Sequence, residues 1–363
     1  MNEKEIIAWL KNNNIHNFSI ENGRVNVNEN VDISNMELTE IPIPFGKIMG
    51  NFYCQANLLI SLKNAPISVY GNFNVSRNKL ITLEYSPSIV EGSFDASSND
   101  GLKLLGSPDR VGFDYVCRYC GLESLEGIST EIGRGLFLSD NKLTNLDYFP
   151  KSVGSHIFLA NNKLLSLEHL PRHINGSLVL SSNLLSSLTY ISDIIEGDLD
   201  ISFNKLEEID FFPNIIGGDI LLSNNYLTSL RGLNKDICKY LFLDNNKLTS
   251  FSHFPKKING TLKINNNPIN SFENFPQEIS EDISLLGVTI SYKTPNLKHI
   301  LNCKLEGNII INNDSEILKG YENIGEAYRN ERVILTQDFK KLLLSLSLEN
   351  NLSSNHKKIL KKL

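Results

Sequence analysis

The chain has 363 residues, of which 41% are hydrophobic and 21% charged, and its formal net charge is −6. This composition excludes wholesale disorder, and the length exceeds what one ordinary core supports, so we expect two domains or an elongated repeat protein. Apolar runs of at most about five residues predict no transmembrane segment, no signal peptide is expected, and the negative charge disfavours nucleic acid as a partner. Five cysteines, an odd number without a disulfide framework, favour a reducing, cytoplasmic location.

Residues 1–30 are predicted to form an N-terminal cap that consists of a helix and a hairpin. Ile6, Ile7 and Leu10 lie at helical spacing within residues 3–11. Residues 18–33 alternate in polarity, and Asn22-Gly23 is typical of a tight hairpin turn. Such a cap would cover the exposed core and edge of the first coil in a stack of repeats.

From residue 31 to 290 the sequence repeats every 21 residues, without insertion or deletion. We number each of the twelve repeats from a reference position, which is occupied by Asn57, Asn78, Asn99, Asn141, Asn162, Asn183, Asn204, Asn225, Asn246 and Asn267, and in the other two repeats by Met36 and Cys120. Position +5 is apolar and position +12 is β-branched in all twelve repeats. A fixed period of this length is typical of a solenoid.

Each repeat is predicted to supply one short strand to a parallel sheet. The residues before the reference position alternate, as in Leu178-Val179-Leu180, which indicates a strand with one buried face. One coil cannot bury its own apolar face, so twelve stacked coils would share a continuous core. Proline at position +9 in eight repeats disfavours helix there and predicts an extended or polyproline-like convex side. The reference asparagine is expected to bond backbone groups that would otherwise be buried unpaired.

The unit G-x-L-x-L-S-x-N-x-L-T-x-L-x-x-x-P-x-x-I resembles a leucine-rich repeat, over about 70% of the chain. The short, proline-bearing unit is similar to the subclass found in effectors of enteric pathogens. The spelling of the repeats and the lead-in VDISNMELTEIPIPFGKIMGNFYC are still more similar to uncharacterised leucine-rich proteins of tailed bacteriophages. The resemblance implies a leucine-rich-repeat solenoid with a parallel β-sheet on its concave face, which binds other proteins. The enteric effectors often append a ubiquitin-ligase domain with a catalytic cysteine, which we do not expect here because only about 70 residues follow the array.

Residues 291–363 are predicted to form a C-terminal cap with a basic helical tail. We expect a strand within residues 305–313, a helix over 336–350 and a second short helix over 353–363. The last 24 residues contain six lysines against one glutamate. Two interpretations stay open: a cap with a solvated lysine face that lies against its own acidic sheet, or an amphipathic tail that contacts a membrane surface or an acidic partner.

The outward positions of the predicted strands supply a candidate binding surface. Position −4 lies between two core residues, so its side chain should point away from the core. In four consecutive repeats this position is apolar, which defines an apolar strip of Val116, Phe137, Phe158 and Val179. With neighbouring positions included, the candidate partner-binding residues are Val116, Tyr119, Phe137, His156, Phe158, Val179, Asp198, Asp200, Phe203, Asp219, Leu221, Tyr240 and Phe242.

Three interpretations of this surface stay open: a site for a protein partner, a ladder of side chains that stabilises the sheet, or a surface covered by the chain's own tail. Across positions −6, −4, −2 and −1 there are eight acids (Asp32, Asp95, Asp114, Asp140, Asp198, Asp200, Asp219 and Asp244). The basic residues there are Arg77, Arg118 and Lys263. The balance favours a partner with basic residues and disfavours DNA or RNA.

The sequence predicts no enzyme, no cofactor and no metal site. Cys117 and Cys120 spell C-R-Y-C, which is compatible with zinc or redox chemistry. The repeat explains them better, because Cys117 occupies an inward position, as Cys54 does, and Cys120 replaces a reference asparagine. Phosphate-binding glycine loops and a nucleophile elbow do not occur. The acids Asp198, Asp200 and Asp219 could hold a cation or exchange a proton, but we interpret them as solvated or partner-facing charge.

We therefore predict a non-enzymatic protein-interaction scaffold, and specifically a phage protein that acts on a host protein in the host cytoplasm, for example as an inhibitor or counter-defence factor. A bacterial effector or adaptor, and a structural virion or assembly component, are the alternatives. The sequence does not indicate the oligomeric state.

Overall fold

The computed structural model describes residues 1–351 except 234–238, 292, 298, 313–314, 316–317, 319–324 and 329–330, so the helix predicted over 353–363 lies outside it. By its contacts the chain divides into two compact units. The first contains Met1–Leu184 and Thr189–Gly197, and the second contains Leu185–Leu188 and the residues from Asp198 onward. Both are built from the same 21-residue coil, with parallel strands that pair at intervals of 21 residues. The predicted leucine-rich-repeat solenoid is thereby confirmed, while the division into cap, array and cap stays a prediction. None of the described helices is long and apolar enough to cross a membrane.

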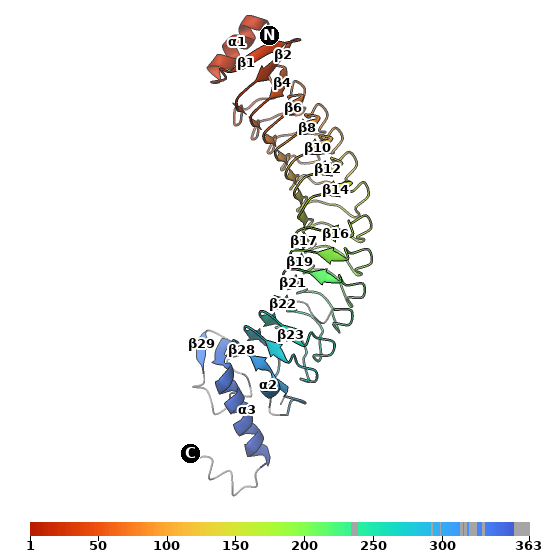
Figure 1. Ribbon diagram of the computed structural model, residues 1–363, viewed down its shortest axis with the longest axis vertical. Coiled ribbons are helices and arrows are strands. Elements are labelled where there is room, and N and C mark those ends of the chain that lie inside the picture. Colours follow the sequence, from red (N-terminus) through yellow and green to blue (C-terminus); the bar gives the residue numbers. More distant parts are fainter. Residues whose placement is uncertain are drawn as a thin grey trace. The chain divides into compact units, whose positions relative to one another are not determined.

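The first unit begins with the predicted helix and hairpin, which cover one end of the stack (Figure 1). Helix α1 (Glu3–Asn12) starts at a capping box, in which the Asn2 side chain accepts from the Glu5 N–H and the Glu5 side chain accepts from the Asn2 N–H. Strands β1 (Phe18–Glu21) and β2 (Arg24–Val27) pair in antiparallel fashion around two left-handed residues, Asn22 (φ 51°) and Gly23 (φ 74°).

The second strand of this hairpin extends one of the sheets of the repeat array. Strand β2 pairs in parallel with β4 (Phe45–Ile48), and the Trp9 ring of α1 meets the Phe45 ring edge-on at 6.4 Å. The N-terminal cap is therefore attached to the array through both a sheet edge and an aromatic contact.

Glu29 ties the hairpin to the end of α1, and its ionisation provides a test of this cap. Its Oε1 accepts from the backbone N–H groups of Asn17 (2.8 Å) and His16 (2.6 Å), and these bonds lower the pKa of Glu29. A carboxyl with a lowered pKa in the folded state stabilises that state above its unfolded pKa, and the contribution is lost as pH falls through the folded value. We expect protection of the His16 and Asn17 amides from hydrogen exchange to fall on acidification below about pH 4. Glu29→Gln should reduce that protection at neutral pH and flatten its pH dependence, whereas Glu21→Gln in the neighbouring strand should do neither.

The first unit has one sheet built from the strands that precede the reference positions. Each strand is only two residues long, with the first residue buried and the second facing outward. In sheet order they are β3 (Val31–Asp32), β5 (Phe52–Tyr53), β7 (Phe73–Asn74), β9 (Phe94–Asp95), β11 (Tyr115–Val116), β13 (Leu136–Phe137), β15 (Ile157–Phe158) and β17 (Leu178–Val179). We call the outward surface of these strands the sheet face.

A second set of two-residue strands follows position +9, which is proline in most coils and serine before β12 and β18. They are β6 (Ser68–Val69), β8 (Ile89–Val90), β10 (Arg110–Val111), β12 (Glu131–Ile132) and β14 (Ser152–Val153), which continue from β4, and the pair β16 (His173–Ile174) and β18 (Ile194–Ile195). The prediction of an extended backbone opposite the sheet face is confirmed.

The core lies between the two sets of strands and uses the predicted positions. All twelve residues at position +5 are buried, from Ile41 to Phe272, which confirms this part of the repeat pattern. In the first unit the core also contains an aromatic column at position −5. The rings of Phe52, Phe73 and Phe94 stack at 5.6 and 5.9 Å, and Tyr115 follows at 5.0 Å. The Tyr115 hydroxyl lies 3.0 Å from the Ser107 hydroxyl, which satisfies its polar end in the core.

The ten reference asparagines are buried and form the expected ladder of hydrogen bonds. In Asn162, Nδ2 donates to the carbonyl oxygens of Leu138 (3.0 Å) and Leu159 (3.1 Å), while Oδ1 accepts from the Leu143 N–H (3.0 Å). Each asparagine thus joins its own strand end to the preceding coil. Cys120 replaces this contact with its Sγ, which lies 3.3 Å from the carbonyl oxygens of Ala96 and Arg118.

The second unit continues the same coil and ends in a small mixed subdomain. Its sheet runs through β19 (Leu199–Asp200), β21 (Ile220–Leu221), β22 (Leu241–Phe242), β24 (Leu262–Lys263), β26 (Ile283–Ser284), β28 (Asn308–Asn312), β30 (Glu331–Leu335) and β29 (Glu326–Tyr328). The other side contains β20 (Ile215–Ile216), β23 (Lys257–Ile258), β25 (Glu278–Ile279) and β27 (Lys304–Leu305).

The C-terminal end of the second unit matches the predicted elements within the described range. Strand β28 falls within the strand predicted over 305–313, and helix α3 (Thr336–Asn351) coincides with the helix predicted over 336–350. Helix α3 packs on β28 and β30, and the short helix α2 (His299–Asn302) contacts it (Figure 1). Phe339 and Leu342 of α3 are buried, so the apolar side of this helix belongs to the core of the second unit.

Candidate functional site

The apolar strip lies on the sheet face of the first unit, as the strand pattern predicts. Its four side chains belong to strands β11, β13, β15 and β17, which are neighbours in the sheet. All four are half-buried, while the residues that precede them in their strands are fully buried. The strip is therefore a continuous row of partly exposed apolar side chains, spaced by the distance between paired strands.

Aromatic contacts organise the middle of the strip. The Phe137 and Phe158 rings meet edge-on at 5.0 Å, and the His156 ring lies 5.9 Å from that of Phe158. The Arg118 guanidinium carbon lies 5.8 Å from the Phe137 ring centroid. Such cross-strand pairs stabilise a sheet, so the ladder interpretation and the binding interpretation apply to the same side chains. Tyr119 stands beside the strip and is 61% exposed, which leaves most of its ring free.

The remaining seven candidate residues belong to the second unit and form a group of their own. Leu221 and Phe242 are neighbours on β21 and β22, and both are half-buried. The Lys263 ammonium lies 4.7 Å from the Phe242 ring centroid, and the Tyr240 hydroxyl donates to Glu281 (3.1 Å). Phe203 is 57% exposed, and Asp198, Asp200 and Asp219 are exposed or half-buried. The thirteen residues are thus divided between the two units.

Several of the acidic candidates make structural hydrogen bonds that sequence reasoning missed. Position −6 forms a second polar ladder, in which most of the Asn, Asp, Ser and His side chains accept from the backbone N–H one coil further on. Asp198 accepts from the Asp219 N–H (2.9 Å), and Asp219 accepts from the Tyr240 N–H (3.3 Å). His156 fills the same role through Nδ1, which accepts from the Ser177 N–H (3.0 Å). The recurrence of Asn, Asp and Ser at this position in the 21-residue pattern was the signal available in the sequence.

Asp219 has the properties expected of a carboxylate held in this ladder. Burial and the neighbouring Asp198 raise its pKa, against the lowering effect of the Tyr240 N–H. Asp200 bonds within its own coil, since its Oδ1 accepts from the Ser202 N–H (2.9 Å) and hydroxyl (2.6 Å). Within the described residues no three His, Cys, Asp or Glu side chains are grouped so as to hold a metal ion.

A second row of exposed aromatic residues occurs at position +7, away from the sheet face. Tyr148 and Tyr190 are 63% and 56% exposed, and both have left-handed backbones (φ 65° and 70°). His169, in the coil between them, is also left-handed (φ 76°) and pairs with Asp147 at 3.4 Å. These residues were missed because exposed side chains were compared between repeats only at positions −6, −4, −2 and −1. They are useful as controls, because they resemble the apolar strip in exposure but lie elsewhere on each coil.

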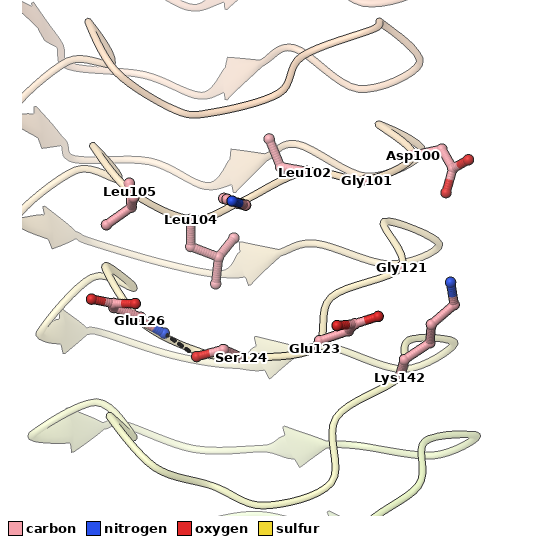
Figure 2. Close-up of a pocket in the computed structure, with 11 residues that line it drawn as sticks. Asp100, Gly101, Leu102, Leu104, Leu105, Gly121, Glu123, Ser124, Glu126 and Lys142 are labelled. Carbon is pink, nitrogen blue, oxygen red and sulfur yellow. Dashed lines mark hydrogen bonds between the residues drawn. The ribbon is translucent and has the colours of Figure 1, made fainter.

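The first unit also contains a cavity of about 460 Å³ between two neighbouring coils (Figure 2). One of its lining residues is Gly101, which has a left-handed backbone (φ 77°) and precedes the buried Leu102. Leu102 and Leu104 are its buried lining residues and Leu105 is an exposed one, while Asp100, Glu123 and Lys142 lie near the turns that follow the strands. Because acidic and basic side chains both surround this cavity, its charge favours neither an anionic nor a cationic ligand.

The cysteines have the environment of core residues. Cys54, Cys117, Cys120 and Cys303 are free and buried, and the Sγ atoms of Cys117 and Cys120 lie 3.3 Å apart. Burial raises the pKa of Cys54 to about 12 and that of Cys303 to about 11. Cys238 lies outside the described residues.

We expect iodoacetamide at pH 8 to leave Cys54 and Cys303 unmodified in the folded protein, because the thiolate is the reactive form and both thiols are protonated and inaccessible. Peptide mass spectrometry before and after unfolding in urea measures this, and both should be labelled only after unfolding. Labelling of Cys54 in the folded protein at the rate of an exposed cysteine would contradict its assignment to the core.

YopM from Yersinia enterocolitica WA-314 is similar to this chain with a TM-score of 0.38 and 15% sequence identity, over 76% of this chain and 87% of that chain. No protein-family model matches the sequence, and no curated protein matches it.

Proposed function

We propose that this protein acts by binding a protein partner across the sheet face of its first unit. The observation that carries the proposal is the apolar strip, four adjacent half-buried side chains on a sheet whose strands are fixed by the asparagine ladder. Monomeric proteins rarely leave such continuous apolar surface uncovered. Because the backbone of this face is already ordered, little conformational entropy is lost when a partner binds.

The charge around the strip supports a partner with basic residues. Asp95, Asp114 and Asp140 lie at outward positions of the first unit, and the Asp114 side chain accepts from the Gly135 N–H (3.0 Å). Complementary charge at the rim of an interface speeds association and excludes wrong partners. The same acids repel a nucleic-acid backbone. Binding, without catalysis, is the activity that we assign to this face.

The seven candidates of the second unit form a further contact area in this proposal. Leu221 and Phe242 supply its apolar part, while Asp198, Asp200 and Asp219 supply negative charge. We treat this area separately from the strip, so each is tested by its own variants.

The biological setting rests on the resemblance of the repeats to leucine-rich proteins of phages. We infer a phage protein that acts on a host protein in the host cytoplasm, with a bacterial effector or adaptor and a virion component as the alternatives. The genes that flank the coding sequence distinguish the first two, and the protein content of purified particles tests the third.

Site-specific photo-crosslinking tests the binding face. A benzophenone amino acid placed at Phe158 should capture one discrete protein from host lysate, identified by mass spectrometry. The same group placed at Tyr148 serves as the matched control and should capture none of that protein. Capture from position 148 but not from position 158 would assign the binding surface to the other side of the coil and contradict the proposal.

A further inference from the structure

A polar cavity of about 390 Å³ lies beside the apolar strip in the first unit. It is lined by residues from the strand ends of four successive coils: Gln55, Asn74, Ser76, Arg77, Asp95, Ser97, Ser98, Arg118 and Tyr119. Two arginines and one aspartate contribute a net positive charge, on a face whose other charges are mostly negative.

The two arginines differ from the other arginines of this unit. Arg110, Arg134 and Arg172 each pair with a carboxylate, and Arg24 donates to backbone carbonyl oxygens. Within the described residues, neither Arg77 nor Arg118 makes a hydrogen bond or ion pair through its guanidinium.

Of the two arginines, Arg118 gives the stronger indication of an anion-binding site. Its Nε is shielded from water and has no hydrogen-bond acceptor, although the half-buried guanidinium also lies 5.8 Å from the Phe137 ring centroid. The Gln55 Oε1 atom, in the same cavity, is also buried without a donor, but as an acceptor it gains nothing from an anion, so only the arginines favour one. Unpaired polar groups in such a position cost stability, and an anion that reaches the free guanidinium nitrogens would recover part of that cost.

We propose that this cavity binds a carboxylate of the partner protein, from an acidic side chain or a chain end. A guanidinium presents paired donors that match a carboxylate, and the single positive charge left after Asp95 suits a monoanion better than a phosphate dianion. The cavity adjoins the strip, since Arg118 lines it and also lies over Phe137. This inference rests on the proposed function and adds an element of specificity to it. On an otherwise acidic face, an acidic group of the partner fits only at this cavity. The cavity therefore fixes the position in which the partner lies along the sheet face.

Titration with small capped peptides tests the cavity without knowledge of the partner. The probes are acetyl-Leu-Glu-Leu-amide, its Gln counterpart and inorganic phosphate, added to the full chain while the NMR signals of Tyr119, Phe137 and the Arg118 Nε–H are followed. We expect the Glu peptide to shift these signals and to bind about tenfold more tightly than the Gln peptide, as charge-assisted hydrogen bonds do. Equal affinity for the two peptides, or tighter binding of phosphate than of the Glu peptide at the same signals, would overturn the proposal.

Variants assign the effect to the two arginines. Arg118→Gln and Arg77→Gln should each remove most of the preference for Glu, Arg118→Lys should retain part of it, and Arg110→Gln, at an exposed arginine outside the cavity, should leave it unchanged. An unaltered preference in Arg118→Gln, with unchanged thermal unfolding, would show that the cavity is not the site. Failure of this inference is distinguishable from failure of the proposed function: Arg118→Gln would then still crosslink the partner through position 158, whereas a wrong binding face abolishes that crosslink in the otherwise unchanged chain.

Discussion

An Asn162→Ala variant should lower the stability of the first unit by about 3 kcal/mol or more. The substitution removes one acceptor and the amide donors that satisfy the Leu143 N–H and the carbonyl oxygens of Leu138 and Leu159. These groups are buried between coils, and a buried group left unpaired costs about 1–3 kcal/mol. Urea unfolding followed by circular dichroism measures the loss, which corresponds to a fall in Tm of about 6–12 °C for a unit of this size.

Two matched variants distinguish the loss of the asparagine hydrogen bonds from the effect of any other substitution in this coil. Lys163→Ala changes the next, exposed residue and should leave stability within about 0.5 kcal/mol of the wild type. Asn162→Cys should be intermediate, because Cys120 shows that a thiol can approach the two carbonyl oxygens but offers no acceptor like Oδ1. Equal unfolding of Asn162→Ala and Lys163→Ala would refute the ladder.

The double variant Phe137→Asp/Phe158→Asp should bind the partner about 30- to 1,000-fold more weakly than the wild type. Burial of an aromatic side chain contributes about 1.5–3 kcal/mol, and both rings are already half-buried, so we expect a combined loss of about 2–4 kcal/mol. The new carboxylates would not themselves repel a partner with basic residues, so the loss is assigned to the removed aromatic contacts and to the desolvation of charge at their place in the interface. Calorimetry with the crosslinked partner, once purified, measures the change.

The fold should survive this double substitution, because the residues that precede Phe137 and Phe158 in their strands carry the core contacts. The control Tyr148→Asp/Tyr190→Asp introduces the same charges at two left-handed positions, where aspartate is tolerated better than tyrosine. The control should bind as the wild type does. Unchanged binding by the Phe137/Phe158 variant would remove the apolar strip from the interface.

The sequence predicted the coil, the strand positions and the buried asparagines because these features recur in fixed register, so each repeat confirms the others. Position +5 is buried in every coil, and Phe137 and Phe158 face outward as their alternation with core residues requires. Features that depend on one coil alone were harder to find. The cavity beside Gly101 includes a glycine that occurs at position +2 in this coil alone, and the cavity at Arg118 requires the strand ends of four coils to meet.

The acidic candidates were only partly understood from sequence. Asp198, Asp219 and His156 were assigned to the binding surface because they occupy outward positions, yet each accepts a backbone N–H from the next coil. Periodicity shows that a position faces outward, but it does not show whether its polar atoms are already engaged. A comparison of the polar residues at position −6 across repeats would have suggested the second ladder.

Hydroxyl-radical footprinting of the protein with and without its partner tests the central claim most directly. The method reports solvent access to individual aromatic side chains, and the two rows of aromatic residues provide an internal comparison. The account predicts that the partner protects Phe137, Phe158 and Tyr119 from oxidation and leaves Tyr148 and Tyr190 unchanged. Protection of Tyr148 and Tyr190, with Phe137 and Phe158 oxidised as in the free protein, would contradict it.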